Sequence, residues 1–235
     1  MKSSLVKFAF ASIIVGLSSS ASAQKAGDFI AGVGGALIVP NASISNISST
    51  SPTYNALLKD ASASIGSSST VVFSGLYMWT DNIATELTLG IPPTMTVDLT
   101  TPNGTSVNHN GAATAKALTP SLVAKYLFNS PGETWRPYLG LGVTYASFTN
   151  VEVNKSDYMV NVLAGTSASL SSSWAPVFNV GTIFNIDDKW SINASISYVP
   201  LKTDATFVNL TGNQTTTGTL TINPVEYVIR LGYKF

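Results

Sequence analysis

The end of the chain shows the pattern of apolar and polar positions most clearly. From Val225 onward the odd positions are apolar or aromatic, whereas the even positions include Glu226 and Arg230. A β-strand sends successive side chains to opposite faces, so the segment predicts a strand with one apolar and one charged face. A continuous apolar stripe opposite an enclosed charged face is typical of a strand that faces lipid. We therefore predict that Thr217–Phe235 contains the closing strand of a membrane barrel.

The same alternation recurs between polar, turn-forming stretches and predicts eight strands. Their connections alternate between long and short, as in outer-membrane barrels with an even number of strands. The predicted fold class is all-β: an eight-stranded antiparallel transmembrane β-barrel with long extracellular loops and short periplasmic turns. The predicted strands are Asp28–Val39, Ser69–Trp79, Ile83–Leu99, Ala117–Phe128, Trp135–Thr149, Ser173–Ile186, Trp190–Leu210 and the closing strand within Thr217–Phe235.

Three long connections are rich in Ser, Thr and Asn and are predicted to be polar loops. They are Asn41–Ser68, Thr100–Lys116 and Asn150–Ser172. Within the first of them, Ser51 can cap a helix that has Pro52 in its first turn. We therefore expect a short helix in that loop.

Aromatic residues support the predicted orientation of the strands. Trp79, Trp135 and Trp190 all fall at strand ends that are assigned to the periplasmic side, whereas Trp174 and Tyr198 fall towards the outer side. Tryptophan and tyrosine gather at the two interfaces of a membrane. Two aromatic belts are therefore expected.

The N-terminal segment is predicted to be a secretory signal peptide. Lys2 and Lys7 flank the start of an apolar run, and Ala21-Ser22-Ala23 fits a cleavage site of the A-x-A kind. The apolar run is too short to span a membrane as a helix. We therefore assign residues 1–23 to the signal peptide and residues 24–235 to a single outer-membrane β-barrel domain.

Composition agrees with a barrel and excludes several other classes of protein. Charged residues make up 10% of the chain, against about 25% in ordinary soluble domains, and 45% of the residues are hydrophobic. The absence of cysteine excludes a disulfide framework and thiolate chemistry. Basic and acidic residues are equal in number, at 12 each, so nothing indicates a nucleic-acid partner.

Six charged residues of the predicted strands take the parity that faces the lumen: Glu86, Lys125, Arg136, Glu226, Arg230 and Lys234. A charge on the lipid face at mid-membrane would cost about 2–4 kcal/mol, which explains why the outward stripes have none. We expect these inward residues to form ion pairs across neighbouring strands. The predicted lumen charge network consists of Glu86, Lys125, Arg136, Glu226 and Arg230.

Several blocks, taken in order, resemble the outer membrane protein W family over nearly the whole of residues 24–235. One departure is Val225-Glu226, where the family pattern usually reads Trp-Val, and another is the small Gly32, where related chains often carry a basic residue. The blocks are AGDFIAGVGGALIVPN (26–41), YMWTDNIATEL (77–87), WRPYLGLGVTY (135–145), SWAPVFNVGTIFNIDDKW (173–190), TDATF (203–207) and INPVEYVIRLGYKF (222–235).

The resemblance implies a small barrel in the outer membrane of a Gram-negative bacterium, with its loops at the cell surface. It also implies passage of small hydrophobic molecules across that membrane. The expected partners are outer-membrane lipid, a small hydrophobic ligand and, through the C-terminal aromatic Phe235, the barrel-assembly machinery. The sequence specifies neither the ligand nor the oligomeric state.

An eight-stranded barrel is too narrow for a wide aqueous pore and holds at most one small ligand. Candidates to line an outer apolar pocket are Trp174, Phe207, Leu57 and Leu58. Trp174 fits an interfacial belt equally well, and the two leucines could simply anchor their loop.

Prolines concentrate in the outer halves of the predicted strands. Proline has no N–H, so each one removes a possible ladder hydrogen bond. One interpretation is a loosely joined wall through which an apolar ligand leaves sideways into the membrane, and the alternative is that these prolines only end strands or sit at bulges. The candidates for a lateral opening are Pro92, Pro93, Pro120, Pro176, Pro200 and Pro224.

The sequence offers no catalytic constellation and no site for a metal or cofactor. The single histidine, His109, falls in a polar stretch that is predicted to be a flexible loop with no strand to hold it. A catalytic base must be held within hydrogen-bond reach of its target, and one histidine alone cannot build a metal site. We therefore expect no enzymatic activity. The alternative to a conduit is a surface receptor, adhesin or structural barrel that acts through its loops.

Overall fold

The computed structural model describes residues 24–58, 60–103, 105–157, 167–208 and 214–235. The predicted signal peptide, residues 1–23, lies outside this range. No helix in the described ranges is both long and apolar enough to cross a membrane.

Eight antiparallel strands close into a barrel, which confirms the predicted fold class. Their bounds are β1 (Phe29–Val39), β4 (Ser68–Met78), β5 (Ile83–Gly90), β8 (Ser121–Leu127), β9 (Trp135–Val153), β11 (Ser173–Asn185), β12 (Trp190–Tyr198) and β15 (Val225–Lys234). The hydrogen-bonded order is β11-β12-β15-β1-β4-β5-β8-β9, and β9 pairs back to β11. The predicted closing strand thus lies between β12 and the first strand, β1.

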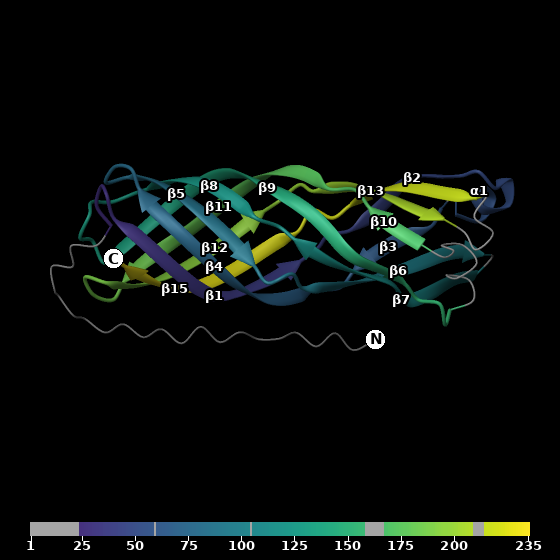
Figure 1. Cartoon of the computed structure of the whole chain (residues 1–235), viewed down its shortest axis with the longest axis horizontal. Coiled ribbons are helices and arrows are strands. Elements are labelled where there is room, and N and C mark those ends of the chain that lie inside the picture. The colour runs from purple at the N-terminus through teal and green to yellow at the C-terminus, as the bar shows by residue number, and fades with distance from the viewer. Residues whose placement is uncertain (1–23, 59, 104, 158–166, 209–213) are drawn as a thin grey trace.

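A second group of elements continues the barrel beyond one end, at the right of Figure 1, and is called the extension here. The extension also includes the last part of β9. Its other elements are β2 (Ser43–Ser49), α1 (Pro52–Leu58), β3 (Ser62–Ile65), β6 (Thr94–Asn103), β7 (Thr105–Leu118), β10 (Ser167–Leu170), β13 (Lys202–Val208) and β14 (Thr215–Thr221).

The extension corrects the prediction of long polar loops. The stretch Thr100–Lys116 belongs to the β6–β7 hairpin, and Asn41–Ser68 contains β2, α1 and β3. Only the short helix was predicted, and α1 begins at Pro52 as expected. Threonine favours strands, and an extension in water needs polar residues on its outward face, so Ser/Thr-rich strands resembled loops in composition.

Two separate sheets build the extension. One continues the barrel sheet as β9-β7-β6-β3, and the other has the order β10-β13-β14-β2. β2 lies next to β3 and β10 lies next to β9, but within the described part of the chain no backbone ladder joins either pair. The extension therefore has two seams, defined here as the β2–β3 and β9–β10 boundaries.

The barrel carries its apolar side chains on the outside. Leu141 is 61% exposed although it lies in the middle of a paired strand, and Val33 and Ile229 are similarly exposed. In β1, Phe29, Val33 and Leu37 face outward while Ile30 and Ile38 are buried; the sequence alone does not decide the facing of this strand, because both of its faces carry apolar residues. Such an inverted distribution is expected when the outer surface contacts lipid.

Aromatic side chains gather at the end of the barrel that carries the short turns, which we call the turn end. Trp79, Trp135 and Trp190 are all exposed, and the Trp190 and Tyr233 rings lie 4.8 Å apart between centroids. Near the extension, Trp174 packs against Tyr145, with 5.0 Å between the ring centroids. Two groups of exposed aromatic residues at different heights match the predicted belts.

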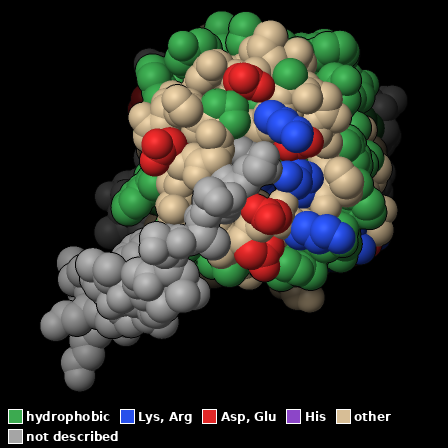
Figure 2. All heavy atoms as spheres, turned by 90° about the vertical axis from the view of Figure 1, so that its left-hand side faces the viewer, with side chains coloured by type: hydrophobic (Ala, Val, Ile, Leu, Met, Phe, Trp, Pro, Cys, Tyr) green, Lys and Arg blue, Asp and Glu red, His purple; other side chains and the backbone are tan. Residues whose placement is uncertain are grey.

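The turn end itself is polar. Figure 2 shows acidic and basic side chains on this face, with apolar side chains around the rim. In the turn before β12, the Asp187 carboxylate accepts hydrogen bonds from the backbone N–H groups of Lys189 and Trp190, at 2.8 and 2.7 Å. These two bonds lower the pKa of Asp187 below its usual value.

We predict that Leu141→Arg lowers the folding stability of the barrel in lipid vesicles by about 2–4 kcal/mol, because it places a charge on the lipid face. The same substitution in the extension, Val107→Arg, should change stability by less than about 0.5 kcal/mol, because Val107 is 44% exposed in a part that stands in water. Denaturant unfolding in vesicles measures both. Equal costs for the two variants would contradict this position of the membrane.

Candidate functional site

An apolar cavity of about 110 Å³ lies inside the extension, between its two sheets. All of its elements contribute to the lining, from β2 through β14. Engineered apolar cavities of about 150 Å³ stay dry and bind molecules such as benzene. The lining residues include Ile44, Ile47, Ala63, Val97, Leu99, Ala115, Val151, Leu170, Ala205 and Leu220.

Two of the four predicted pocket residues reach this cavity. Leu58 at the end of α1 and Phe207 in β13 both line it. Trp174 does not: it is 69% exposed on the outer surface of the barrel and fits the alternative reading as a belt residue. The Leu57 side chain lies outside the described part of the structure.

Most of the lining was not predicted from the sequence, and on β7 the lining residues are small. Ala113, Ala115 and Ala117 alternate along β7 with Thr114 and Lys116, and Ala115 and Ala117 are buried. This alternation is a strand pattern with a period of two. It could have revealed the inward face of the hairpin.

A second, smaller cavity of about 30 Å³ lies directly below the first, where below means towards the turn end. The strands show this order, because Ala115 and Leu220 line the upper cavity while Ala117 and Ile222, two residues further along the same chain segments, line the lower one. The lower lining also includes Ile38, Pro93, Met95, Phe148, Leu201, Pro224 and Glu226.

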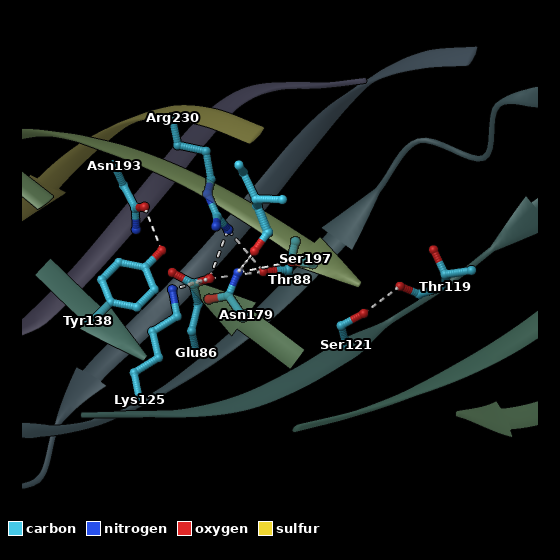
Figure 3. Close-up of polar contacts among 11 residues, drawn as sticks. Glu86, Thr88, Thr119, Ser121, Lys125, Tyr138, Asn179, Asn193, Ser197 and Arg230 are labelled. Carbon is cyan, nitrogen blue, oxygen red and sulfur yellow. Dashed lines mark hydrogen bonds and ion pairs between the residues drawn. The ribbon is translucent and has the colours of Figure 1, made fainter. Parts of the chain in front are cut away.

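Beneath these cavities a charged cluster fills the lumen of the barrel. Glu86 on β5 lies between Lys125 on β8 and Arg230 on β15, with both cations 2.9 Å from the same carboxylate oxygen, Oε1. Arg230 also donates to the Thr88 hydroxyl at 3.0 Å. Figure 3 shows the three charged side chains converging from separate strands. We call Glu86, Lys125 and Arg230 the lumen cluster.

The other two predicted members of the charge network stand apart from this cluster. Arg136 is fully buried near the turn end and donates to the backbone carbonyls of Gln24, Asp81 and Asn129. Glu226 faces the lower cavity instead. Arg136 therefore links backbone segments at the turn end by hydrogen bonds and does not take part in the lumen cluster.

Tyr138 completes the obstruction of the lumen. Its hydroxyl donates to Asn193 Oδ1 at 2.8 Å, and Lys125 Nζ lies 4.2 Å from its ring centroid. A Cβ atom on Gly181 would lie 2.5 Å from the Tyr138 hydroxyl oxygen, so glycine is needed there. Below the ring, Ile30, Leu76, Met78, Ala84, Leu127 and Ile183 pack into a closed apolar layer.

Backbone hydrogen bonds of the barrel wall are interrupted beside Pro92 and Pro93, between β5 and β6. The β4–β5 pairing ends with the bond from Ile91 N to Val71 O, at 2.9 Å, and pairing with the β3 side resumes with Gly66 N to Thr96 O, at 3.1 Å. In the described structure, no backbone hydrogen bond joins residues 67–70 to residues 92–95 between these points. Neither proline has an N–H that could close this gap.

The wall stays hydrogen-bonded at three of the other candidate prolines. The Pro120 carbonyl accepts from Tyr145 N at 3.1 Å, and the Pro224 carbonyl accepts from Val199 N at 3.1 Å. The bond from Ile222 N to Leu201 O, at 2.9 Å, continues the wall beside Pro200. Pro176 lies within β11, in register with Val143 of β9. The chain thus uses carbonyl groups to keep the wall closed at these prolines.

His109 lies in β7, which corrects the prediction of a flexible loop without a strand. The side chain is buried, with Nε2 at 3.2 Å from the Thr101 hydroxyl and Nδ1 at 2.8 Å from Asp157 Oδ2. The sequence of contacts from Thr101 through His109 to Asp157 resembles the nucleophile, base and orienting acid of a catalytic triad. Thr101, however, is only 1% exposed, and the contacts join β6, β7 and the turn that follows β9.

We predict that Glu86→Gln lowers the free energy of unfolding by about 3–5 kcal/mol, because it leaves Lys125 and Arg230 buried without their shared anion. Urea unfolding in lipid vesicles measures the loss. Glu133→Gln, which removes an exposed carboxylate in a turn, is the matched control and should be neutral. A loss below about 1 kcal/mol for Glu86→Gln would show that the two cations do not depend on this anion.

Comparison with known proteins agrees with this architecture. The chain matches the OmpW family over residues 25–235. It is 30% identical over 218 residues to outer membrane protein W of Vibrio cholerae, covering 91% of each chain. The crystal structure of the outer membrane protein OprG from Pseudomonas aeruginosa aligns with a TM-score of 0.78 and 25% identity, over 91% of this chain and 98% of that chain.

The solution structure of the Escherichia coli outer membrane protein W also aligns, with a TM-score of 0.54 and 26% identity. It covers 90% of this chain and 99% of that chain. The relatives are named as outer-membrane proteins, and the apolar outer face and closed ladder suit that membrane. The chain therefore belongs to the OmpW family of outer-membrane β-barrels.

Proposed function

We propose that this protein is a passive conduit that takes small hydrophobic molecules into the outer membrane and releases them sideways through its wall. The observation that carries the proposal is the pairing of an apolar cavity with an obstructed lumen. The extension holds about 110 Å³ of apolar space, whereas the barrel below it is filled by the lumen cluster and Tyr138. A molecule that enters the cavity has no straight path to the turn end.

The proposed orientation places the extension at the cell surface and the turn end in the periplasm. Short turns on the periplasmic side and longer segments outside are the usual arrangement in such barrels. The chain ends on the exposed Phe235 at the turn end, where its N–H donates to Phe29 O at 3.0 Å. This position leaves the terminal aromatic accessible, as recognition by the barrel-assembly machinery would require.

The proposed exit lies at Pro92–Pro93. Pro93 lines the lower cavity, and the backbone hydrogen bonds of the wall are interrupted beside it. An apolar molecule in the lower cavity is therefore next to a stretch of wall where residues 67–70 and 92–95 share no backbone hydrogen bond that would have to break. The charged lumen cluster below opposes further descent, because desolvating it would be costly.

We also propose that the protein has no enzymatic activity, since the buried Thr101 and His109 do not reach the cavity lining. A role as a receptor or adhesin would instead use the outward, polar face of the extension. The two roles differ in one respect: a conduit needs the cavity, whereas a surface receptor does not.

We predict that Ala115→Phe reduces uptake of octane at least severalfold, because Ala115 is buried against the cavity and a phenyl group would fill much of its volume. Whole cells that contain an octane-oxidising enzyme report uptake as the rate of oxidation. The matched control is Ala124→Phe, since Ala124 faces outward on β8. Wild-type uptake in a folded Ala115→Phe variant would reject the conduit and favour the surface role.

A second prediction tests the exit. Replacing Pro92 and Pro93 with threonine restores two N–H donors, so octane oxidation should slow while octane still binds to the purified protein. Pro176→Thr provides the control, because Pro176 lies within the paired β11. If the double variant folds and transports like the wild type, the molecule does not leave at this point.

A further inference from the structure

Glu226 is a carboxylate placed among apolar side chains. It follows the first residue of β15, in register with Ile38 of β1 and Ser197 of β12. It lines the lower cavity together with Met95 and Phe148. Carboxylates are rarely placed in apolar surroundings unless they are paired, because leaving water costs a charged group several kcal/mol.

Within the described structure no hydrogen bond or ion pair engages this carboxylate, and the charge of Arg230 attracts it only from beyond ion-pair distance. Its oxygens make no hydrogen bond, and no Lys, Arg or His nitrogen lies within 4.0 Å of them. The closest candidate in sequence, Arg230, is held by Glu86 and Thr88 at 2.9 and 3.0 Å. The facing Ser197 hydroxyl accepts from Asn179 at 2.9 Å.

Glu226 lies beside the proposed path of the ligand. The lower cavity lies between the large apolar cavity and the lumen cluster, and Pro93 of the proposed exit shares its wall. Glu226 is therefore an acceptor that faces the path at its narrow end. The surrounding apolar side chains match the body of a hydrophobic ligand, and the carboxylate matches one hydrogen-bond donor at its end.

Glu226 is also the one charged residue among the described residues that line the lower cavity. An apolar residue at position 226 would give a lower cavity without any carboxylate. The Glu226 carboxylate therefore bears on which ligands this chain binds rather than on how the barrel folds.

We infer that Glu226 is a specificity-determining residue, and that the preferred ligands are apolar molecules with one protonated amine, whose ammonium group pairs with the Glu226 carboxylate in the lower cavity. This inference rests on the proposed function. An alkyl ammonium ion supplies both parts of the match, because its chain fills apolar space and its N–H groups donate to the carboxylate. At neutral pH such amines are protonated, as the lysine side chain is.

Methionine methyl groups provide a local measurement. Met95 lines the lower cavity beside Glu226, whereas Met78 is fully buried in the apolar layer at the turn end. With ¹³C-methyl methionine in the protein and the protein in lipid nanodiscs, titration with octylamine, 1-octanol or octane should shift the Met95 resonance. The Met78 resonance should stay in place and reports that the fold is intact.

We expect octylamine to bind the wild-type protein about tenfold or more tightly than 1-octanol, because its ammonium group gives the Glu226 carboxylate a charge-assisted hydrogen bond. Glu226→Gln should remove this preference and leave octane and 1-octanol binding within about twofold. Glu226→Val, which replaces the carboxylate with an apolar side chain, should lose the preference and bind octane at least as well. Glu133→Gln controls for the general effect of removing a carboxylate.

The outcomes separate this inference from the function on which it rests. If octane or 1-octanol shifts Met95 but octylamine binds no more tightly, or if Glu226→Gln keeps the full preference for the amine, the role of Glu226 is rejected and the conduit stands. If none of the three probes shifts Met95 in the wild-type protein, both proposals fail.

Discussion

Closure of the backbone hydrogen-bond ladder is the constraint on which the rest of this structure depends. In lipid, every backbone N–H and C=O of a spanning segment must find a partner within the protein. The eight barrel strands meet this requirement by pairing β9 back to β11. Once the chain leaves the membrane the requirement is relaxed, and the wall changes accordingly: it loses pairing at Pro92–Pro93 and divides into two sheets.

The closed ladder also determines what the lumen must contain. An eight-stranded barrel is just wide enough for side chains to fill it, and its outward face excludes charge, so the polar residues of the strands point inward. Glu86, Lys125 and Arg230 come from three strands and converge on one carboxylate oxygen. A buried cluster of this kind is costly to desolvate and more costly to break. The lumen cluster therefore fills the barrel beneath the cavity, and the barrel supports the extension.

The barrel could be predicted from the sequence because lipid imposes a strict rule of alternation. Residues such as Leu141 and Ile229 are outside for the same reason that Glu86 and Lys125 are inside. In the extension water replaces lipid, and strands with Thr outside and Ala inside, such as the segment around Ala115, carry a much weaker pattern. That is why the end of β6 and most of β7 were predicted as a loop and the setting of His109 was missed.

The pairing of individual charges could not be predicted from the sequence, for a different reason. Parity places Arg136, Glu226 and Arg230 in the lumen, and the structure agrees, but parity contains no information on height along the barrel axis. Height depends on the stagger between strands, which places Arg230 beside Glu86 and leaves Glu226 at the lower cavity. Two residues that share a face can therefore belong to different layers.

The seams at β2–β3 and β9–β10 have a consequence for selectivity. Two sheets that meet without a ladder can move apart by a hinge motion at their bases, and among the described residues such motion breaks no backbone hydrogen bond between them. For the proposed conduit, this means that molecules of different width could enter the space between the sheets at a similar energetic cost. In the proposed conduit, discrimination by size would then be weak, and recognition would depend on chemical features of the ligand at the lower cavity, where Glu226 lies.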